Sequence, residues 1–163
     1  MQKFIQVLPN DQATHSVGEK LAALAQAPLL ITLSGPLGAG KTSLVRAFLR
    51  ALGVQGAIKS PSYALVEPYK FSNFSVYHFD FYRFFDHNEW EDSGFRDFFE
   101  EHAICLVEWP DKAGGLLPHA DLEIVLSYDI KEDANPALAG RQIEVSAASP
   151  RGEALVKQMI EQQ

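Results

Sequence analysis

The stretch from Leu33 to Arg46, LSGPLGAGKTSLVR, places three glycines directly ahead of a lysine and a threonine. Its central part, GPLGAGKT, matches the P-loop pattern GxxxxGKS/T. In that pattern the glycines let the backbone curl, so that successive N–H groups point at phosphate oxygens, and the following helix adds the positive end of its dipole. Side chains at Gly38 and Gly40 would block the curl. The motif therefore predicts that Lys41 reaches the phosphates of a nucleoside triphosphate.

Two absences favour ATP as the nucleotide. P-loop proteins that select guanine usually carry an Asn-Lys-x-Asp element, and the chain has none. It also lacks an LSGGQ-like signature of transporter ATPases. The hydroxyl of Thr42 is expected to face Mg²⁺ beside the phosphates.

Two acidic residues are candidates to complete such a site. In a P-loop fold, the magnesium ion and the attacking water need acids at the C-terminal ends of neighbouring strands. Glu108 ends the apolar run AICLVE, and Asp80 lies within the aromatic run VYHFDFYRF. Which of them binds the metal and which orients water stays open. Alternatively, Glu108 is a surface acid at a strand end, and Asp80 is a partner of Arg83 or His78.

Two further segments could meet the γ-phosphate or a partner. In KSPSYALVEPY, Ser60 and Ser62 flank a rigid proline, in a loop where P-loop switch segments approach the γ-phosphate. An ordinary turn would have the same composition. Trp109 directly follows Glu108, where it could stack on a base, gate a loop, meet a partner or belong to the core.

Strands and helices alternate around these residues. Apolar positions at helical spacing predict a helix over residues 11–26, with Asp11 as its N-cap. PLLITLS, residues 28–34, is typical of a strand buried on both faces, and the helix after the P-loop should end at Gly53. Strand, glycine loop and helix then follow in the order a phosphate site requires.

The second half of the chain predicts more strands and a closing helix. Ser149 and Pro150 are typical of a helix N-cap and first turn. A strand over residues 76–84 would put His78, Asp80 and Tyr82 on one face. The other predicted strands are AICLVEW, ADLEIVLSYDI and RQIEVSA. We therefore expect an α/β, P-loop NTPase-like fold, with a mainly parallel central sheet flanked by helices and some antiparallel strands toward the C-terminus.

Composition narrows the class of protein. A chain of 163 residues can bury a sizeable core, so we expect a single domain over residues 1–163. No apolar run is long enough for a bilayer, and no secretory signal opens the chain. Cys105 is the only cysteine, so it has no partner for an internal disulfide or a thiolate metal site. We expect a cytoplasmic protein without membrane contact.

The net charge of −7 disfavours autonomous binding to nucleic acid, because the long-range field repels a phosphate backbone. A local basic patch around Lys59, Lys70 and Arg83 remains compatible with that charge.

Four segments in this order, GPLGAGKTSLVR, SPSYALVEPY, HFDFYRF and VEWPDK, resemble the motifs of the bacterial TsaE family, formerly the YjeE family. The resemblance implies a small P-loop ATPase that works with the TsaB and TsaD proteins. Together they make threonylcarbamoyladenosine in tRNAs that read codons beginning with adenine. The family member is not itself the carbamoyl transferase, and tRNA is met indirectly through the complex.

The resemblance also implies roles for matching residues. Thr42, Glu108 and Asp80 would face Mg²⁺ and the γ-phosphate, and Ser62 departs from the threonine that is usual in the family. Serine keeps the hydroxyl and loses a methyl group. The residues implied for ATP are Asp11 and Thr14 near the adenine, and Leu37, Gly38, Ala39, Gly40, Lys41, Thr42 and Ser43 at the phosphates. Those implied for the switch or for partners are Ser60, Ser62, Tyr63, Arg83 and Trp109.

The expected reaction is Mg²⁺-dependent hydrolysis of ATP to ADP, with Lys41, Asp80 and Glu108 as the catalytic residues. No obvious arginine finger is visible, although Arg83 could act in cis, so hydrolysis should be slow and stimulated by a partner. A small-molecule kinase would need a basic lid, and the candidate segment DIKEDANPALAGR is acidic and rich in alanine. A nucleotide-sensing adaptor without turnover is the non-enzymatic alternative.

Overall fold

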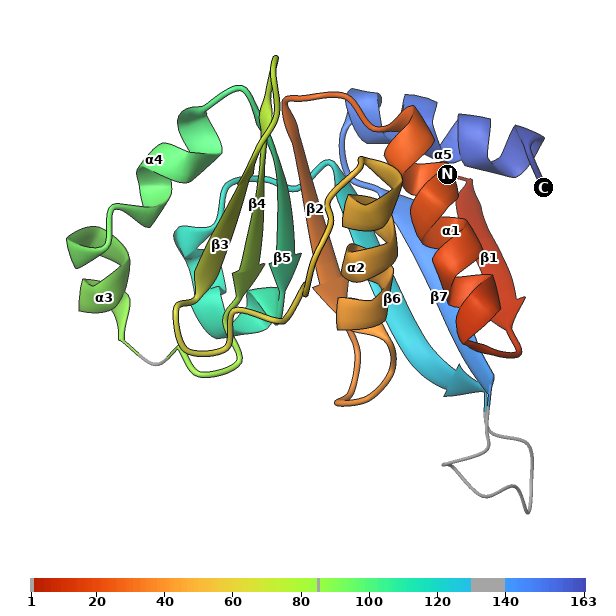
Figure 1. The fold of residues 1–163 in the computed structure, drawn as a ribbon, viewed down its shortest axis with the longest axis horizontal. Helices are drawn as coiled ribbons and strands as arrows, with labels where there is room; N and C mark the ends of the chain where they lie inside the picture. The colour runs from red at the N-terminus through yellow and green to blue at the C-terminus, as the bar shows by residue number, and fades with distance from the viewer. Residues whose placement is uncertain (1, 85, 130–139) are drawn as a thin grey trace.

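The computed structural model describes residues 2–84, 86–129 and 140–163, and in these ranges seven strands form one sheet (Figure 1). In chain order, the elements are β1 (Lys3–Leu8), α1 (Asp11–Leu24), β2 (Leu29–Ser34), α2 (Lys41–Ala51), β3 (Val66–Lys70), β4 (Ser75–Asp80), α3 (His87–Asp92), α4 (Phe95–Glu100), β5 (Ala103–Glu108), the 3₁₀ helix η1 (Pro110–Leu116), β6 (Leu122–Asp129), β7 (Gly140–Ala147) and α5 (Pro150–Glu161). None of the helices in the described ranges is both long and apolar enough to cross a bilayer.

The centre of the sheet is parallel and its edges are antiparallel. The strand order is β1-β7-β6-β2-β5-β4-β3. The four strands from β6 to β4 run parallel, whereas β7 and β1 at one edge and β3 at the other are antiparallel to their neighbours. This confirms the expected α/β fold. The strands at residues 3–8 and 66–70, and the short helices α3 and α4, were not predicted.

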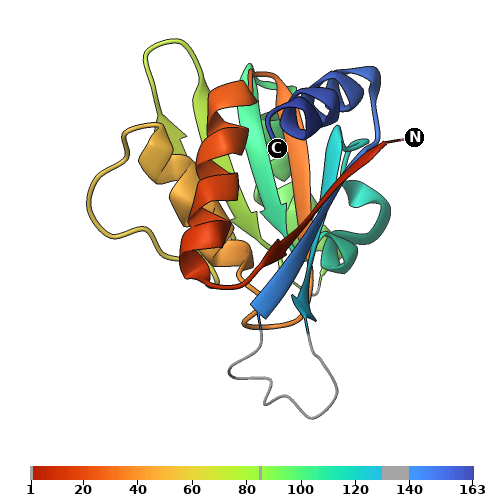
Figure 2. The same cartoon turned by 90° about the vertical axis from the view of Figure 1, so that its right-hand side faces the viewer.

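Helices cover both faces of the sheet (Figures 1 and 2). One core cluster joins α1, α2 and α5 to one face, with Phe48 and Val76 among its buried side chains. The second cluster joins α3, α4 and η1 to the other face, and includes Phe79 and Trp90. Since successive side chains of a strand point to opposite faces, the alternation along β4 sends His78 and Asp80 to the face that α2 covers.

The strand predicted over residues 76–84 ends early, at Asp80. There the Oδ1 of Asp80 accepts a hydrogen bond from the backbone N–H of Tyr82 at 3.0 Å, and residues 82 and 83 form a turn. An aspartate that bonds the backbone two residues on is a turn former. Tyr82 therefore leaves the face of His78 and is 40% exposed.

Side-chain hydrogen bonds cap the first and last helices, and one of the two N-cap residues differs from the prediction. Asn10, not Asp11, is the N-cap of α1, and its Oδ1 accepts from the N–H of Ala13 at 3.0 Å. Asp11 lies in the first turn, where a negative charge is favourable. The predicted cap at Ser149 is confirmed, since its Oγ accepts from the N–H of Gly152. Gly53 follows α2 with a φ of +100°. Most of the candidate kinase lid, residues 130–139, lies outside the described residues.

Candidate nucleotide site

The loop between β2 and α2 needs its glycines. Gly35 has a φ of +146°, and a Cβ there would lie 2.2 Å from the carbonyl oxygen of Leu126. Gly38 has a φ of +78°, and its Cβ would lie 2.9 Å from the Oη of Tyr128. Left-handed backbone and close approach to β6 together exclude larger residues at both positions. Gly40, with a φ of +104°, directly precedes α2.

Side chains from the neighbouring strands hold the loop from outside. The hydroxyl of Tyr128 on β6 donates to the carbonyl oxygen of Leu37 at 2.8 Å. The guanidinium of Arg141 on β7 donates to the carbonyl oxygen of Gly38 at 3.1 Å and stacks on the Tyr128 ring at 4.3 Å. The loop is thus anchored through two of its carbonyl groups to β6 and β7.

Lys41 lies at the centre of the loop. Its ammonium group donates to the carbonyl oxygens of Gly35 and Pro36 at 2.5 and 3.0 Å. It also sits 4.2 Å from the ring centroid of Trp109, a cation–π distance. The Trp109 ring packs in turn against Tyr82 at 4.9 Å. Trp109 therefore covers the lysine and is only partly buried.

Burial lowers the pKa of Lys41. The carboxylates of Glu108, Asp80 and Asp111 oppose that shift, because their negative charge favours the ammonium form. The Lys41 ammonium group thus lies in the field of three carboxylates.

Glu108 and Asp80 come side by side at the carboxyl ends of two parallel strands. They are direct partners in the register between β4 and β5, and both are buried. The hydroxyl of Thr42, in the first turn of α2, donates to both oxygens of Glu108 at 3.0 and 3.2 Å. The Nε2 of His78 lies 2.6 Å from the second oxygen. Glu108 is therefore not a solvated surface acid.

Asp80 holds the loop that carries the predicted switch. The hydroxyl of Ser60 donates to its Oδ2, and the N–H of Tyr82 donates to its Oδ1. Within the described residues, the Asp80 carboxylate therefore bonds to Ser60 and to the backbone of Tyr82, and not to Arg83 or His78 as the alternative interpretation had it. The serine predicted for the switch thus touches the second acid directly.

Strained backbone flanks both acids. Leu65 has a φ of +69°, and its carbonyl oxygen accepts from the N–H of Asp80 at 3.0 Å. Trp109, directly after Glu108, has a φ of +57°. Non-glycine residues rarely adopt such angles, and where they do, they cluster at functional sites.

Two of the other predicted switch and partner residues, Tyr63 and Arg83, contact each other. Tyr63 is 86% exposed, and the guanidinium of Arg83 lies 4.7 Å from its ring centroid. Within the described ranges, Ser62 makes no hydrogen bond to the acids, and Arg83 stacks on Tyr63 rather than reaching the loop. Leu37, at the tip of the P-loop, is 62% exposed.

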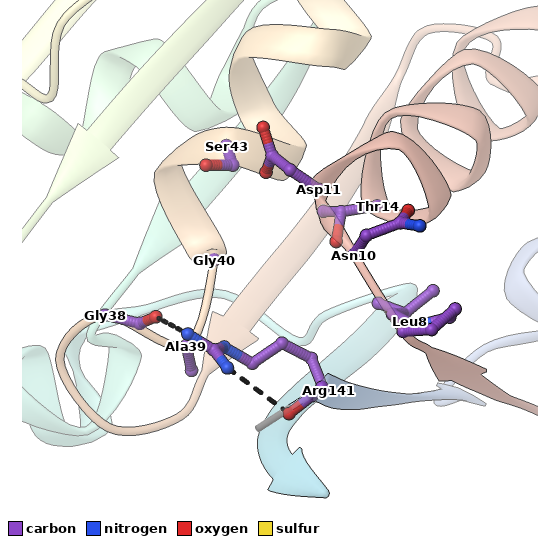
Figure 3. A pocket seen from close by; sticks show the side chains of 11 residues that line it. Leu8, Asn10, Asp11, Thr14, Gly38, Ala39, Gly40, Ser43 and Arg141 are labelled. Carbon is purple, nitrogen blue, oxygen red and sulfur yellow. Dashed lines mark hydrogen bonds between the residues drawn. The ribbon is translucent and has the colours of Figure 1, made fainter. Parts of the chain in front are cut away.

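A pocket of about 290 Å³ opens between the P-loop, the start of α1 and β7 (Figure 3). Six of the residues predicted for ATP line it: Asp11, Thr14, Gly38, Ala39, Gly40 and Ser43. The remaining lining residues are Leu8, Pro9, Asn10, Gly140 and Arg141. Lys41 and Thr42 do not line the pocket; they lie in the first turn of α2, and Thr42 contacts Glu108. The pocket is near the lower end of the volumes typical of small-ligand sites.

The donor set suits Mg²⁺. Across the described part of the chain, no three His, Cys, Asp or Glu side chains gather into a metal cage. Magnesium usually takes one or two carboxylates together with phosphate oxygens and water rather than a cage made only of protein. The Thr42 hydroxyl and the carboxylates of Glu108 and Asp80 are oxygen ligands of that kind.

Sequence reasoning missed three neighbours of the site. His78 was considered only as a partner of Asp80, although it contacts Glu108. Arg141 comes from a strand far away in sequence, and nothing local to it indicates that it reaches the P-loop. Asn10 lines the pocket and could have been found, because asparagine is among the preferred N-cap residues.

Comparison with known proteins decides the family. A family model described as threonylcarbamoyl adenosine biosynthesis protein TsaE matches residues 8–137. The chain belongs to the TsaE family. This places it among the proteins of threonylcarbamoyladenosine biosynthesis, a modification of tRNA.

Individual relatives agree with the family model over nearly the whole chain. The TsaE protein of Haemophilus influenzae is 38% identical over 161 residues, which are 96% of this chain and 97% of the relative. That of Bacillus subtilis is 31% identical and covers 92% of this chain and 89% of its own. The crystal structure titled Bacillus subtilus YdiB matches with a TM-score of 0.78 and 25% identity, over 99% of this chain and 96% of that one.

Proposed function

We propose that this TsaE-family protein binds and hydrolyses ATP with Mg²⁺, in support of TsaB and TsaD, during threonylcarbamoyladenosine modification of tRNA in the cytoplasm. The observation that carries the proposal is the contact between Thr42 and Glu108 beside a glycine loop that encloses Lys41. This contact links the end of the proposed phosphate-binding loop to an acid on the neighbouring strand. Transfer of a phosphoryl group to water in P-loop proteins uses a hydroxyl and an acid in such positions to hold the metal.

Lys41 is proposed to stabilise the charge of the phosphates. Its ammonium group now occupies the loop through the carbonyl oxygens of Gly35 and Pro36. Binding of the triphosphate would exchange these carbonyl contacts for phosphate oxygens. Because the lysine is buried, its attraction for a phosphate would be screened less than in water.

The two acids are proposed to divide the remaining work. When bound, Mg²⁺ would neutralise charge on the β- and γ-phosphates. Thr42 and Glu108 would hold that ion, and Asp80, fixed by Ser60 and Tyr82, is placed to orient water. Water would attack the γ-phosphorus while the bond from that phosphorus to the oxygen bridging it to the β-phosphorus breaks. ADP would leave with the electron pair of that bond, and the proton lost by the water would pass to the released phosphate.

Slow hydrolysis without partners is expected. In the described part of the chain, Arg83 stacks on Tyr63 and does not contact the P-loop, so it is not in place to act as an arginine finger. A partner that moves Arg83 or supplies its own cation would raise turnover. We propose TsaB and TsaD for this role.

An assay of phosphate release tests the proposal. The purified chain is measured with ATP and Mg²⁺, alone and with TsaB, TsaD and tRNA. We expect slow release that the partners stimulate, and its loss in Lys41→Ala. Lys157→Ala, which removes an exposed lysine from α5, is the matched control and should behave as wild type.

Two other results would contradict the proposal. Bound ATP without phosphate release under any condition would indicate a nucleotide-sensing adaptor. Release that depends on a small metabolite, and yields its phosphorylated form, would indicate a kinase.

A further inference from the structure

His78, in β4, is a buried polar side chain that contacts the candidate site but has no part in the proposed reaction. Its ring is fully buried, and its Nε2 lies 2.6 Å from the Oε2 of Glu108, which is itself almost fully buried. Water therefore does not compete for this contact. A charge-assisted hydrogen bond of this length is among the stronger kinds in proteins.

We propose that His78 is a positioning residue, which fixes the orientation of the Glu108 carboxylate toward Thr42 and a magnesium ion. The inference rests on the proposed function, because it concerns the acid assigned to Mg²⁺.

The contacts of Glu108 show why a second donor is needed. The hydroxyl of Thr42 donates to both oxygens of the Glu108 carboxylate, at 3.0 and 3.2 Å, and the Nε2 of His78 lies 2.6 Å from its Oε2. The terminal torsion of a glutamate is broad, so one donor alone does not fix the plane of the carboxylate. Thr42 is itself assigned to the metal, and a hydroxyl that turns its oxygen to a cation changes its contact with the acid. His78 is the donor that can stay in place in both states.

Packing alone does not account for a histidine at this position. Among the described residues, the Nδ1 of His78 has no hydrogen-bond partner although it is buried. Burying a polar atom without a partner costs free energy, and a leucine would fill similar space without that cost. The hydrogen bond between Nε2 and Glu108 is the interaction that offsets the cost of burying Nδ1.

Chemistry fixes the direction of the bond. The form of Glu108 that binds a cation is the carboxylate, which only accepts hydrogen bonds. The proton between the two side chains therefore belongs to Nε2 of His78. A side chain that orients a metal ligand in this way typically changes metal affinity or activity by about 10–100-fold when it is removed.

The test measures how much Mg²⁺ strengthens ATP binding. Isothermal titration calorimetry gives the dissociation constant of ATP with Mg²⁺ and with EDTA, and the readout is the dissociation constant in EDTA divided by that in Mg²⁺. We expect His78→Leu to lower this ratio about tenfold or more and to leave the value in EDTA unchanged. His78→Gln, whose amide N–H can reach the same place, should restore most of the ratio. His78→Asn, which is also polar but shorter, should not.

Val76→Ala is the matched control. Val76 is fully buried on the same face of β4, two residues from His78 and farther from the acid. Its truncation should lower the melting temperature measured by circular dichroism and leave the ratio unchanged. Should His78→Leu fail to fold, the pair of Gln and Asn variants decides the question.

A double-mutant cycle separates positioning from a general effect. In Glu108→Ala the ratio is already low, and adding His78→Leu should lower it no further. An equal drop in both backgrounds would overturn the inference, and so would a wild-type ratio in His78→Leu. If wild-type protein binds ATP equally well with Mg²⁺ and with EDTA, the magnesium site itself fails, and the role of His78 fails with it.

Discussion

Gly35→Ala should be among the most damaging single substitutions in the chain. Alanine would have to adopt a φ of +146°, at a cost of about 1–3 kcal/mol. Its Cβ would also lie 2.2 Å from the carbonyl oxygen of Leu126, whereas real Cβ atoms essentially never come within 3.0 Å. The loop or β6 must therefore move, and overpacking of this kind costs about 1–3 kcal/mol more.

Together these effects should lower the free energy of unfolding by about 2–6 kcal/mol, a large share of the roughly 5–15 kcal/mol of a small domain. The shift should also disturb the contact between Lys41 and the carbonyl oxygen of Gly35. We therefore expect Gly35→Ala to lose ATP binding as well as stability.

Gly53→Ala is the matched control, because it isolates the backbone strain. Gly53 has a φ of +100°, but no atom lies within 4 Å of the position of its Cβ. It should lose about 1–3 kcal/mol and keep ATP binding. Urea unfolding followed by tryptophan fluorescence measures both variants, and calorimetry measures ATP affinity. Equal losses of stability in the two variants would refute the reasoning from the close approach to β6.

Three further substitutions or treatments test other parts of the structure. Glu108→Ala should lower phosphate release about a hundredfold while it leaves ATP affinity in EDTA unchanged; wild-type turnover would remove its assignment. Burial raises the pKa of the Cys105 thiol to about 12, so at pH 8 the thiol stays protonated and should react with a disulfide reagent only after unfolding in urea. Rapid labelling of the native chain would contradict this. Asn10→Ala should lower stability by about 1 kcal/mol through loss of the α1 cap, measured by thermal melting, whereas Asn10→Asp keeps a capping oxygen and should lose less.

Local patterns predicted the elements with strong end signals. The closing helix was predicted from Ser149, because an N-cap acts on groups within one turn. The strand around Asp80 was predicted too long, because the aromatic pattern continues past the point where the carboxylate turns the chain at Tyr82. The edge strand β1 was missed, since it pairs with β7 from the far end of the sequence.

The sequence by itself determined the phosphate loop, because every group that shapes it is nearly consecutive in the chain. The glycines, Lys41 and Thr42 follow one another, and their spacing alone predicts how the backbone must curl. The end of the strand AICLVE was also readable, which made Glu108 a candidate, whereas Asp80 was a candidate as an acid inside an aromatic run.

Only the tertiary structure decided which side chains meet. The strand order places β5 between β2 and β4, so that Glu108 of β5 contacts both Thr42, which follows β2, and His78 of β4. It also brings Arg141 of β7 to the loop. Such contacts depend on how strands pair across the sheet, which the periodicity of any one strand does not specify.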